Sequence, residues 1–118
     1  MAFAIMVTVA MTSPVFVKAS QCFGSGGYSA EADLIPSSIF DSASAYTENN
    51  NFGSSNVAVS LMAMDSAGVV FAMSGVDYSA HKAEESISGY GTATKYKSVH
   101  AIYDLGYNYI ASMTIEKP

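Results

Sequence analysis

Residues 56–74 read NVAVSLMAMDSAGVVFAMS, and this stretch decides the fold class. From Val57 to Ala63 every second residue is apolar, and the residues between them are mostly apolar as well. Alternation with two apolar faces indicates a central strand of a sheet. The run Asp-Ser-Ala-Gly at 65–68 is typical of a tight turn with glycine in the left-handed position. The stretch therefore predicts a β-hairpin over Asn56–Ser74.

Short alternating segments and turn residues continue on both sides of this hairpin. Further strands are expected at 28–35, 42–48, 87–96, 97–103 and 107–115, with breaks at Pro36, 49–53 and 104–106. The polar segment 75–86 is expected to be a helical turn or a polar edge strand. No segment shows apolar residues at the 3.6-residue spacing of a helix. The chain is therefore expected to be all-β, an antiparallel two-sheet β-sandwich of six or seven strands.

Composition sets the class of protein. A chain of 118 residues has the length of one domain. Half of the residues are apolar and 13% are charged, against roughly 25% in an ordinary soluble protein, so the chain is too apolar to be disordered. All five basic residues are lysines and the net charge is −5. This balance excludes nucleic-acid binding, which needs a basic footprint, and a basic membrane-surface helix.

The first nineteen residues look like an export signal. No charge occurs in residues 1–17, and the run ends in Val17-Lys18-Ala19, which fits a signal-peptidase site. We therefore expect a signal peptide over 1–19, a flexible leader over 20–27, a β-sandwich domain over 28–118, and a secreted protein. The basic residue that usually precedes the apolar run is missing, as it would be if translation starts upstream. A lipoprotein attached through Cys22, an uncleaved membrane anchor, and a buried first strand or helix of the domain remain alternatives.

Tyrosines are frequent in the second half of the chain, and five of them form the candidate binding site. If several face outward together, they make an aromatic platform for sugar rings or for a protein partner. A half-buried sheet would use the same residues. The alternation from 107 to 115 places the last two on one face of the closing strand with Ala111. The five are Tyr90, Tyr96, Tyr103, Tyr107 and Tyr109.

The other chemistry-bearing residues favour structural roles. The two histidines, His81 and His100, would need a nearby carboxylate such as Glu84 to hold a metal, and we expect both to be ordinary surface histidines. No Gly-x-Ser-x-Gly elbow is present, and the aspartates cluster at expected turns. Neither enzymatic activity nor a cofactor or metal is therefore expected. The one cysteine, Cys22, has no partner for an intramolecular disulfide and is either inert or paired with another molecule.

The domain resembles small secreted β-sandwich proteins of Gram-positive bacteria. The resemblance rests on the strand pair 56–74, the Ser/Gly/Tyr-rich segment after it, and Lys97-Ser98-Val99-His100 before the closing strand. More remotely, the chain is similar to bacteriocins of the lactococcin 972 type. The aromatic ending and the tryptophans of such bacteriocins are missing here, since the chain ends in Thr114-Ile115-Glu116-Lys117-Pro118. No functional residue is carried over from either resemblance.

Three functions remain open at the level of sequence. The first is a secreted, non-enzymatic module that binds a protein or carbohydrate of a cell envelope. The second, which the resemblance implies, is a bacteriocin-like effector that acts on the envelope of neighbouring cells. The third is a subunit that assembles with copies of itself through sheet edges. Contact with a membrane is expected only if residues 1–19 are retained.

Overall fold

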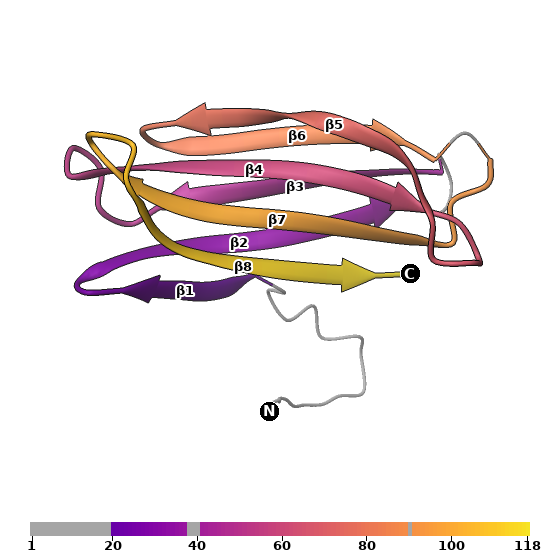
Figure 1. The fold of residues 1–118 in the computed structure, drawn as a ribbon, viewed down its shortest axis with the longest axis horizontal. Helices are drawn as coiled ribbons and strands as arrows, with labels where there is room; N and C mark the ends of the chain where they lie inside the picture. The colour runs from indigo at the N-terminus through magenta and orange to yellow at the C-terminus, as the bar shows by residue number, and fades with distance from the viewer. Residues whose placement is uncertain (1–19, 38–40, 90) are drawn as a thin grey trace, which may run out of the picture.

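A computed structural model of the protein describes residues 20–37, 41–89 and 91–118. It confirms the expected fold class, a sandwich of two antiparallel four-stranded sheets (Figure 1). These described residues form eight strands, rather than the expected six or seven. They are β1 (Gln21–Ser25), β2 (Tyr28–Ser37), β3 (Ser42–Asn49), β4 (Ser55–Met64), β5 (Val70–Ser79), β6 (Lys82–Ser88), β7 (Lys95–Asp104) and β8 (Tyr109–Lys117).

The two sheets share the chain in an interleaved order. One sheet has the strand order β1-β2-β3-β6 and the other has the order β5-β4-β7-β8. The chain passes from one sheet to the other after β3, after β5 and after β6. Each of the six pairs of neighbouring strands in the described part of the chain is antiparallel. Two sheets stacked this way leave each with one inner face and one face open to solvent.

The predicted hairpin is confirmed as β4 and β5, and β4 is a central strand with β5 on one side and β7 on the other. The alternating residues from Val57 to Ala63 point into the core and are fully buried. The facing sheet contributes mainly alanines, including Ala30 and Ala32 on β2 and Ala83 on β6. Large side chains of one sheet therefore pack against small ones of the other, which is how interiors reach crystal-like density.

The expected flexible leader over 20–27 is wrong. Gln21–Ser25 form strand β1, which pairs with β2 through a turn at Gly26 and Gly27. Both glycines have positive φ, 59° and 86°, and two such residues in a row make the tight hairpin turn that matches the strand twist. A glycine-rich run such as GSGG is typical of a flexible leader, but glycines are also the preferred residues of this turn.

The expected single strand over 87–96 is also wrong. Strand β6 ends at Ser88 and β7 begins at Lys95, so the chain changes sheets between them. Gly89 lies so close to the Asp41 carboxylate and the Tyr96 hydroxyl that a Cβ at this position would overlap them. The glycine therefore marks a close approach of two connections.

The proposed signal peptide over 1–19 lies outside the described residues. Within the described residues there is no helix with the length and apolar character needed to cross a membrane.

Candidate functional site

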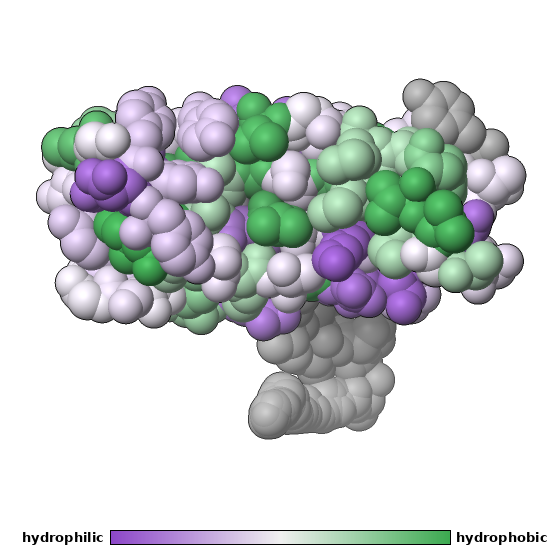
Figure 2. All heavy atoms as spheres, in the orientation of Figure 1, coloured by the Kyte–Doolittle hydropathy of each residue, from purple (hydrophilic) through white to green (hydrophobic). Residues whose placement is uncertain are grey.

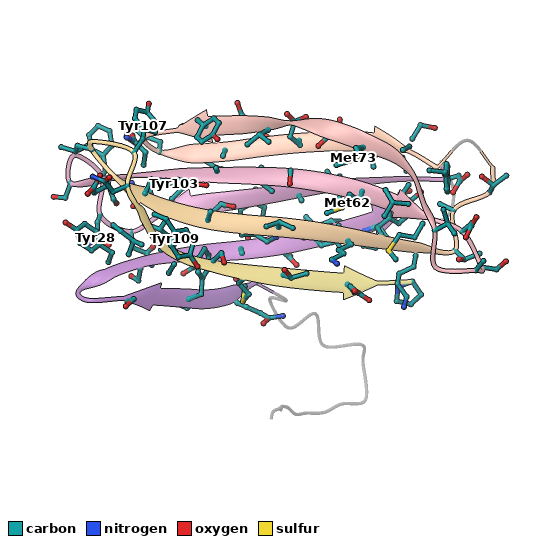
Figure 3. The ribbon with its side chains drawn as sticks, in the orientation of Figure 1. Tyr28, Met62, Met73, Tyr103, Tyr107 and Tyr109 are labelled. Atoms are coloured by element: carbon teal, nitrogen blue, oxygen red, sulfur yellow. The ribbon has the colours of Figure 1, made fainter. Side chains whose placement is uncertain are left out.

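Four tyrosine rings meet on the outer face of the β5-β4-β7-β8 sheet. The centroid of the Tyr78 ring lies 5.9 Å from that of Tyr103 and 6.0 Å from that of Tyr107, and Tyr103 lies 6.4 Å from Tyr109. Tyr103, Tyr107 and Tyr109 gather at one end of the molecule (Figure 3). We call Tyr78, Tyr103, Tyr107 and Tyr109 the tyrosine platform. Three of its rings stay largely in solvent, since Tyr78, Tyr107 and Tyr109 are 51%, 61% and 63% exposed.

Small residues on β4 allow rings from non-adjacent strands to touch. Tyr78 pairs in register with Ala58, and Tyr103 pairs with Asn56 on the other side of the same strand. Because neighbouring strands are about 4.8 Å apart, two rings separated by one strand meet only when the strand between them carries short side chains. Ala58 supplies that gap, and the Tyr78 and Tyr103 rings lean across it at 51° to one another.

A β-bulge places Tyr109 on the outer face. Strand β7 pairs Ile102 with Ala111 but the next residue, Tyr103, with Tyr109, so Ile110 is left without a partner on β7. One extra residue reverses which side the following side chains face. The expectation that Tyr109 shares a face with Ala111 is therefore wrong, since Tyr109 faces outward beside Tyr103. Its hydroxyl is hydrogen-bonded to Ser112 Oγ at 2.9 Å.

The turn between β7 and β8 is held rigid by one carboxylate. Asp104 Oδ1 accepts hydrogen bonds from the backbone N–H groups of Gly106 and Asn108, both at 2.9 Å. The Asn108 side chain donates to the same carboxylate. The hydrogen bonds from Asn108, its backbone first, hold the pKa of Asp104 below its ordinary value. The turn is therefore a fixed support for the residue between the two donors, Tyr107.

Tyr107 has a backbone conformation that side chains rarely adopt. Its φ is +62°, in the left-handed region, and its N–H donates to the Asp104 carbonyl at 2.9 Å. For a residue with a Cβ this region costs roughly 1–2 kcal/mol, and glycine is the usual solution. The conformation turns the Tyr107 ring edge-on to Tyr78, at 79° between ring planes.

The neighbouring hairpin, β4 and β5, has a glycine at the equivalent position with positive φ. Between β4 and β5, Asp65 Oδ1 accepts the N–H groups of Ala67 and Val69, and the Gly68 N–H donates to the Asp65 carbonyl. Gly68 has a φ of +80°. The two turns therefore share their hydrogen bonds position by position, with Gly68 in one and Tyr107 in the other.

Beyond the platform, this outer face carries exposed apolar side chains along β5 and a charged pair at the opposite end of the sheet. Val76 and Met73 on β5 are 54% and 68% exposed. At the far end from the platform, Lys95 forms an ion pair with Glu116, 3.4 Å between Nζ and Oε1. Figure 2 shows this face, with strongly hydrophobic side chains gathered over its right half next to a strongly hydrophilic group. The face is an open sheet surface rather than a pocket, and three shallow hollows among the described residues are lined by other side chains.

Three of the five predicted platform tyrosines come together, and two do not. Tyr103, Tyr107 and Tyr109 belong to the platform, whereas Tyr90 lies outside the described residues. Tyr96 points into the sandwich and is buried. It is seven positions before Tyr103 on the same strand, and an odd separation puts two residues on opposite faces.

The fourth platform member, Tyr78, was missed by the sequence reading. The expected hairpin ends at Ser74 and leaves 75–86 as a helical turn or a polar edge strand, whereas β5 continues to Ser79. The register shifts between β4 and β5 near Gly75, since Ser60 pairs with Val76 but Met62 with Met73. The alternation of Val76 and Tyr78 after that glycine was the available signal.

Buried Tyr96 closes a different cluster. Its hydroxyl donates to Asp41 Oδ1 at 3.1 Å, and the Gly91 N–H donates to Asp41 Oδ2. Burial, together with the Asp41 carboxylate, raises the pKa of Tyr96 to about 12. Asp41 itself has a φ of +46°. The contacts tie the beginning of β3 to the connection before β7, and they explain why Tyr96 is unavailable to the platform.

The expectation that His100 is a surface histidine is wrong. It is fully buried between the sheets, with Nδ1 2.8 Å from Thr47 Oγ1 on β3 and Nε2 2.6 Å from Ser98 Oγ. The Thr47 hydroxyl donates to the Ala58 carbonyl, so it accepts from Nδ1–H, and Nε2 then accepts from Ser98. A neutral ring satisfies every group, and burial lowers the pKa of His100 to about 4.

The remaining candidates stay apart. His81 stacks on Phe52, with 3.7 Å between ring centroids, and Cys22 is exposed on β1. No three His, Cys, Asp or Glu side chains gather into a possible metal site within the ranges that the structure describes. Comparison with known proteins adds no analogy, because no protein family, curated protein or solved structure matches this chain.

Proposed function

We propose that this protein is an exported, non-enzymatic binding module and that the tyrosine platform is its contact surface for a protein of a cell envelope. The observation that carries the proposal is Tyr107, a tyrosine at a position where the twin turn has Gly68. Backbone strain of this kind persists at sites where a side chain is needed in one place. The ring that the strain positions is 61% exposed, so the strained turn does not serve to fill the core.

The arrangement of the rings favours a protein partner over a stacked sugar. The rings meet at 51°, 75° and 79°, so they offer edges and hydroxyls in several directions instead of one plane. Tyrosine is enriched at the energetic centres of protein interfaces because it combines a large apolar area with a hydroxyl. The platform continues into exposed Val76 and Met73, which extends the apolar surface along β5.

Export is the part of the proposal that rests on sequence alone. The uncharged run over 1–17 and the Val-Lys-Ala ending at 19 support a leader for secretion. Low charge and a single cysteine are compatible with an extracellular domain that carries no disulfide. A secreted protein with an exposed aromatic surface meets the proteins of the envelope first.

Binding of the labelled full chain to washed bacterial envelopes tests the proposal. The variant Tyr109→Ser removes an exposed ring without touching the core, and Tyr107→Asn removes the strained one while keeping a residue that tolerates positive φ. Each is expected to weaken binding about tenfold or more, as for central interface tyrosines. Digestion of the envelopes with protease before the assay is expected to remove the part of the binding that the platform variants lose.

Thr114→Ser is the matched control, because it alters an exposed residue of β8 on the same sheet but away from the platform. Its binding should equal that of the unmodified chain. Equal binding by the two platform variants would overturn the proposal. If the binding that depends on Tyr107 and Tyr109 survives protease but is lost after removal of envelope polysaccharide, the partner of the platform is a carbohydrate and not a protein.

A further inference from the structure

The opposite face of the sandwich carries a groove. Two hollows of about 470 and 490 Å³ lie on the outer face of the β1-β2-β3-β6 sheet, and both are lined by Ile35, Ser44 and Ser86. Because they share these residues, they form one continuous depression along β3. We call it the serine groove.

The register of three strands produces this groove. Ser44 on β3 pairs with Ile35 on β2 and with Ser86 on β6, so one small side chain lies between two neighbours. Two residues along the strand, Ser42 takes the same place between its own neighbours. Side chains at every second position share a face, so the two serines make a low floor between β2 and β6.

The floor offers hydroxyl groups that have no protein partner. Ser42, Ser44 and Ser86 make no side-chain hydrogen bond to any residue that the structure describes. A serine hydroxyl both donates and accepts, so a row of them matches a ligand whose own groups do both. Ile35, 49% exposed, adds an apolar wall on one side.

An aromatic ring and mixed charges close one end. Lys82 Nζ lies 4.5 Å from the centroid of the Tyr46 ring and 3.7 Å from Glu84 Oε2. Glu85 lines the same hollow. One ammonium and two carboxylates leave this end with an excess of negative charge, which disfavours an anionic ligand. Carboxylates and an ammonium can still accept from and donate to neutral hydroxyls.

The backbone of the floor is not available for recognition. Strand β3 is paired with β2 along one edge and with β6 along the other. An extended peptide that adds to a sheet needs a free strand edge, and the groove lies over a face that has none. The ligand must therefore be recognised by side chains alone, through hydroxyls and an apolar surface.

We propose that the serine groove binds an extended, uncharged saccharide chain. Sugar hydroxyls hydrogen-bond to Ser42, Ser44 and Ser86, and the apolar face of a sugar ring packs against exposed Ile35. The groove and the tyrosine platform lie on opposite faces of the sandwich, so this proposal stands whether or not the platform binds a protein. A molecule with both sites can hold a glycan on one side and a protein on the other.

Titration of the isotope-labelled full chain with oligosaccharides, followed by NMR, tests the proposal. The probes are four neutral hexasaccharides, built of glucose, mannose, galactose and N-acetylglucosamine, and one anionic hexasaccharide of galacturonic acid. At least one neutral probe is expected to shift the amide signals of 42–46 and 84–86, and the anionic probe is expected to leave them unchanged. Ser44→Leu, which fills the floor, should weaken the response about tenfold, the value of one or two hydrogen bonds.

The matched control is Ser60→Leu, the same change in the central strand of the opposite sheet. It should bind as the unmodified chain does. Ser86→Leu fills the groove from the neighbouring strand and repeats the test if Ser44→Leu does not fold. The proposal is overturned if no neutral probe shifts these signals, if the anionic probe binds as well as the neutral ones, or if both groove variants bind normally.

Discussion

The two hairpins of one sheet end in the same turn but place different residues at its one demanding position. Asp65 and Asp104 each accept the N–H groups of the residues two and four positions later, and each donates its own N–H to the carbonyl of the latter. The third residue after the aspartate has positive φ in both, +80° at Gly68 and +62° at Tyr107. The backbone therefore does not require a tyrosine.

The difference separates what the fold needs from what the surface needs. At Gly68 nothing lies within 4 Å of a Cβ placed on the residue, so a side chain there would contact nothing. At Tyr107 the ring contacts Tyr78 and extends a cluster of four aromatic rings, three of which are largely exposed. A strained residue that mostly faces solvent gives little to the core, and this is why we assign it to binding.

The largest expected effect is a loss of stability in acid. Of the two hairpins, only the one formed by β7 and β8 buries in the core a group that titrates below neutral pH, His100. The inward residues of β4 from Val57 to Ala63 are apolar, whereas β7 carries His100 with a pKa of about 4. Between pH 4 and 6.5 the unfolded chain binds a proton that the folded chain does not. Stability should therefore be full above pH 6.5 and fall by about 3 kcal/mol as the pH drops to 4.

Urea unfolding followed at a series of pH values checks this prediction. His100→Gln removes the titrating group, and its stability should lose this part of the pH dependence while the carboxylates still titrate. If the free energy of unfolding has the same pH dependence between pH 4 and 6.5 in both proteins, His100 is not the group that stays neutral in the folded chain and takes up a proton on unfolding.

The next largest expected effect on stability comes from replacing Gly68, the residue with positive φ in the turn between β4 and β5. Gly68→Tyr puts a Cβ into the left-handed region with no ring beside it, so the free energy of unfolding should fall by about 1–2 kcal/mol. Thermal unfolding measures the change, and Ala67→Tyr, one residue earlier in the same exposed turn, is the control for adding a ring. If Gly68→Tyr costs no more than Ala67→Tyr, the left-handed strain assigned to Tyr107 is not real.

The fold class was predictable because apolar and polar residues alternate along the strands, and this pattern is visible in the sequence. The apolar period of two over 56–64, followed by Asp-Ser-Ala-Gly, is a local signal, and β4 and β5 follow it. Glycine-rich segments were harder to interpret, because the same residues suit linkers, tight turns and close contacts between backbone segments. Gly26 and Gly27 form a hairpin turn where a linker was expected, and Gly89 marks a close approach where a strand was expected.

The site was predictable only in part, because bulges and burial depend on partners far along the chain. The bulge at Ile110 decides that Tyr109 faces outward, and the register of β7 against β8 sets it. His100 has apolar neighbours on both faces of its strand, so alternation alone could not show which face is inside. Its partner Thr47 lies 53 residues away.

The most direct test of the central claim is to make the second turn like the first with Tyr107→Gly, and to measure stability and envelope binding on the same protein. Relief of strain should offset the lost ring contact and the added freedom of glycine, so stability should change by about 0.5 kcal/mol or less. Binding should fall about tenfold or more. Unchanged binding with a loss of stability well above 1 kcal/mol would show that Tyr107 supports the fold, and would contradict the account.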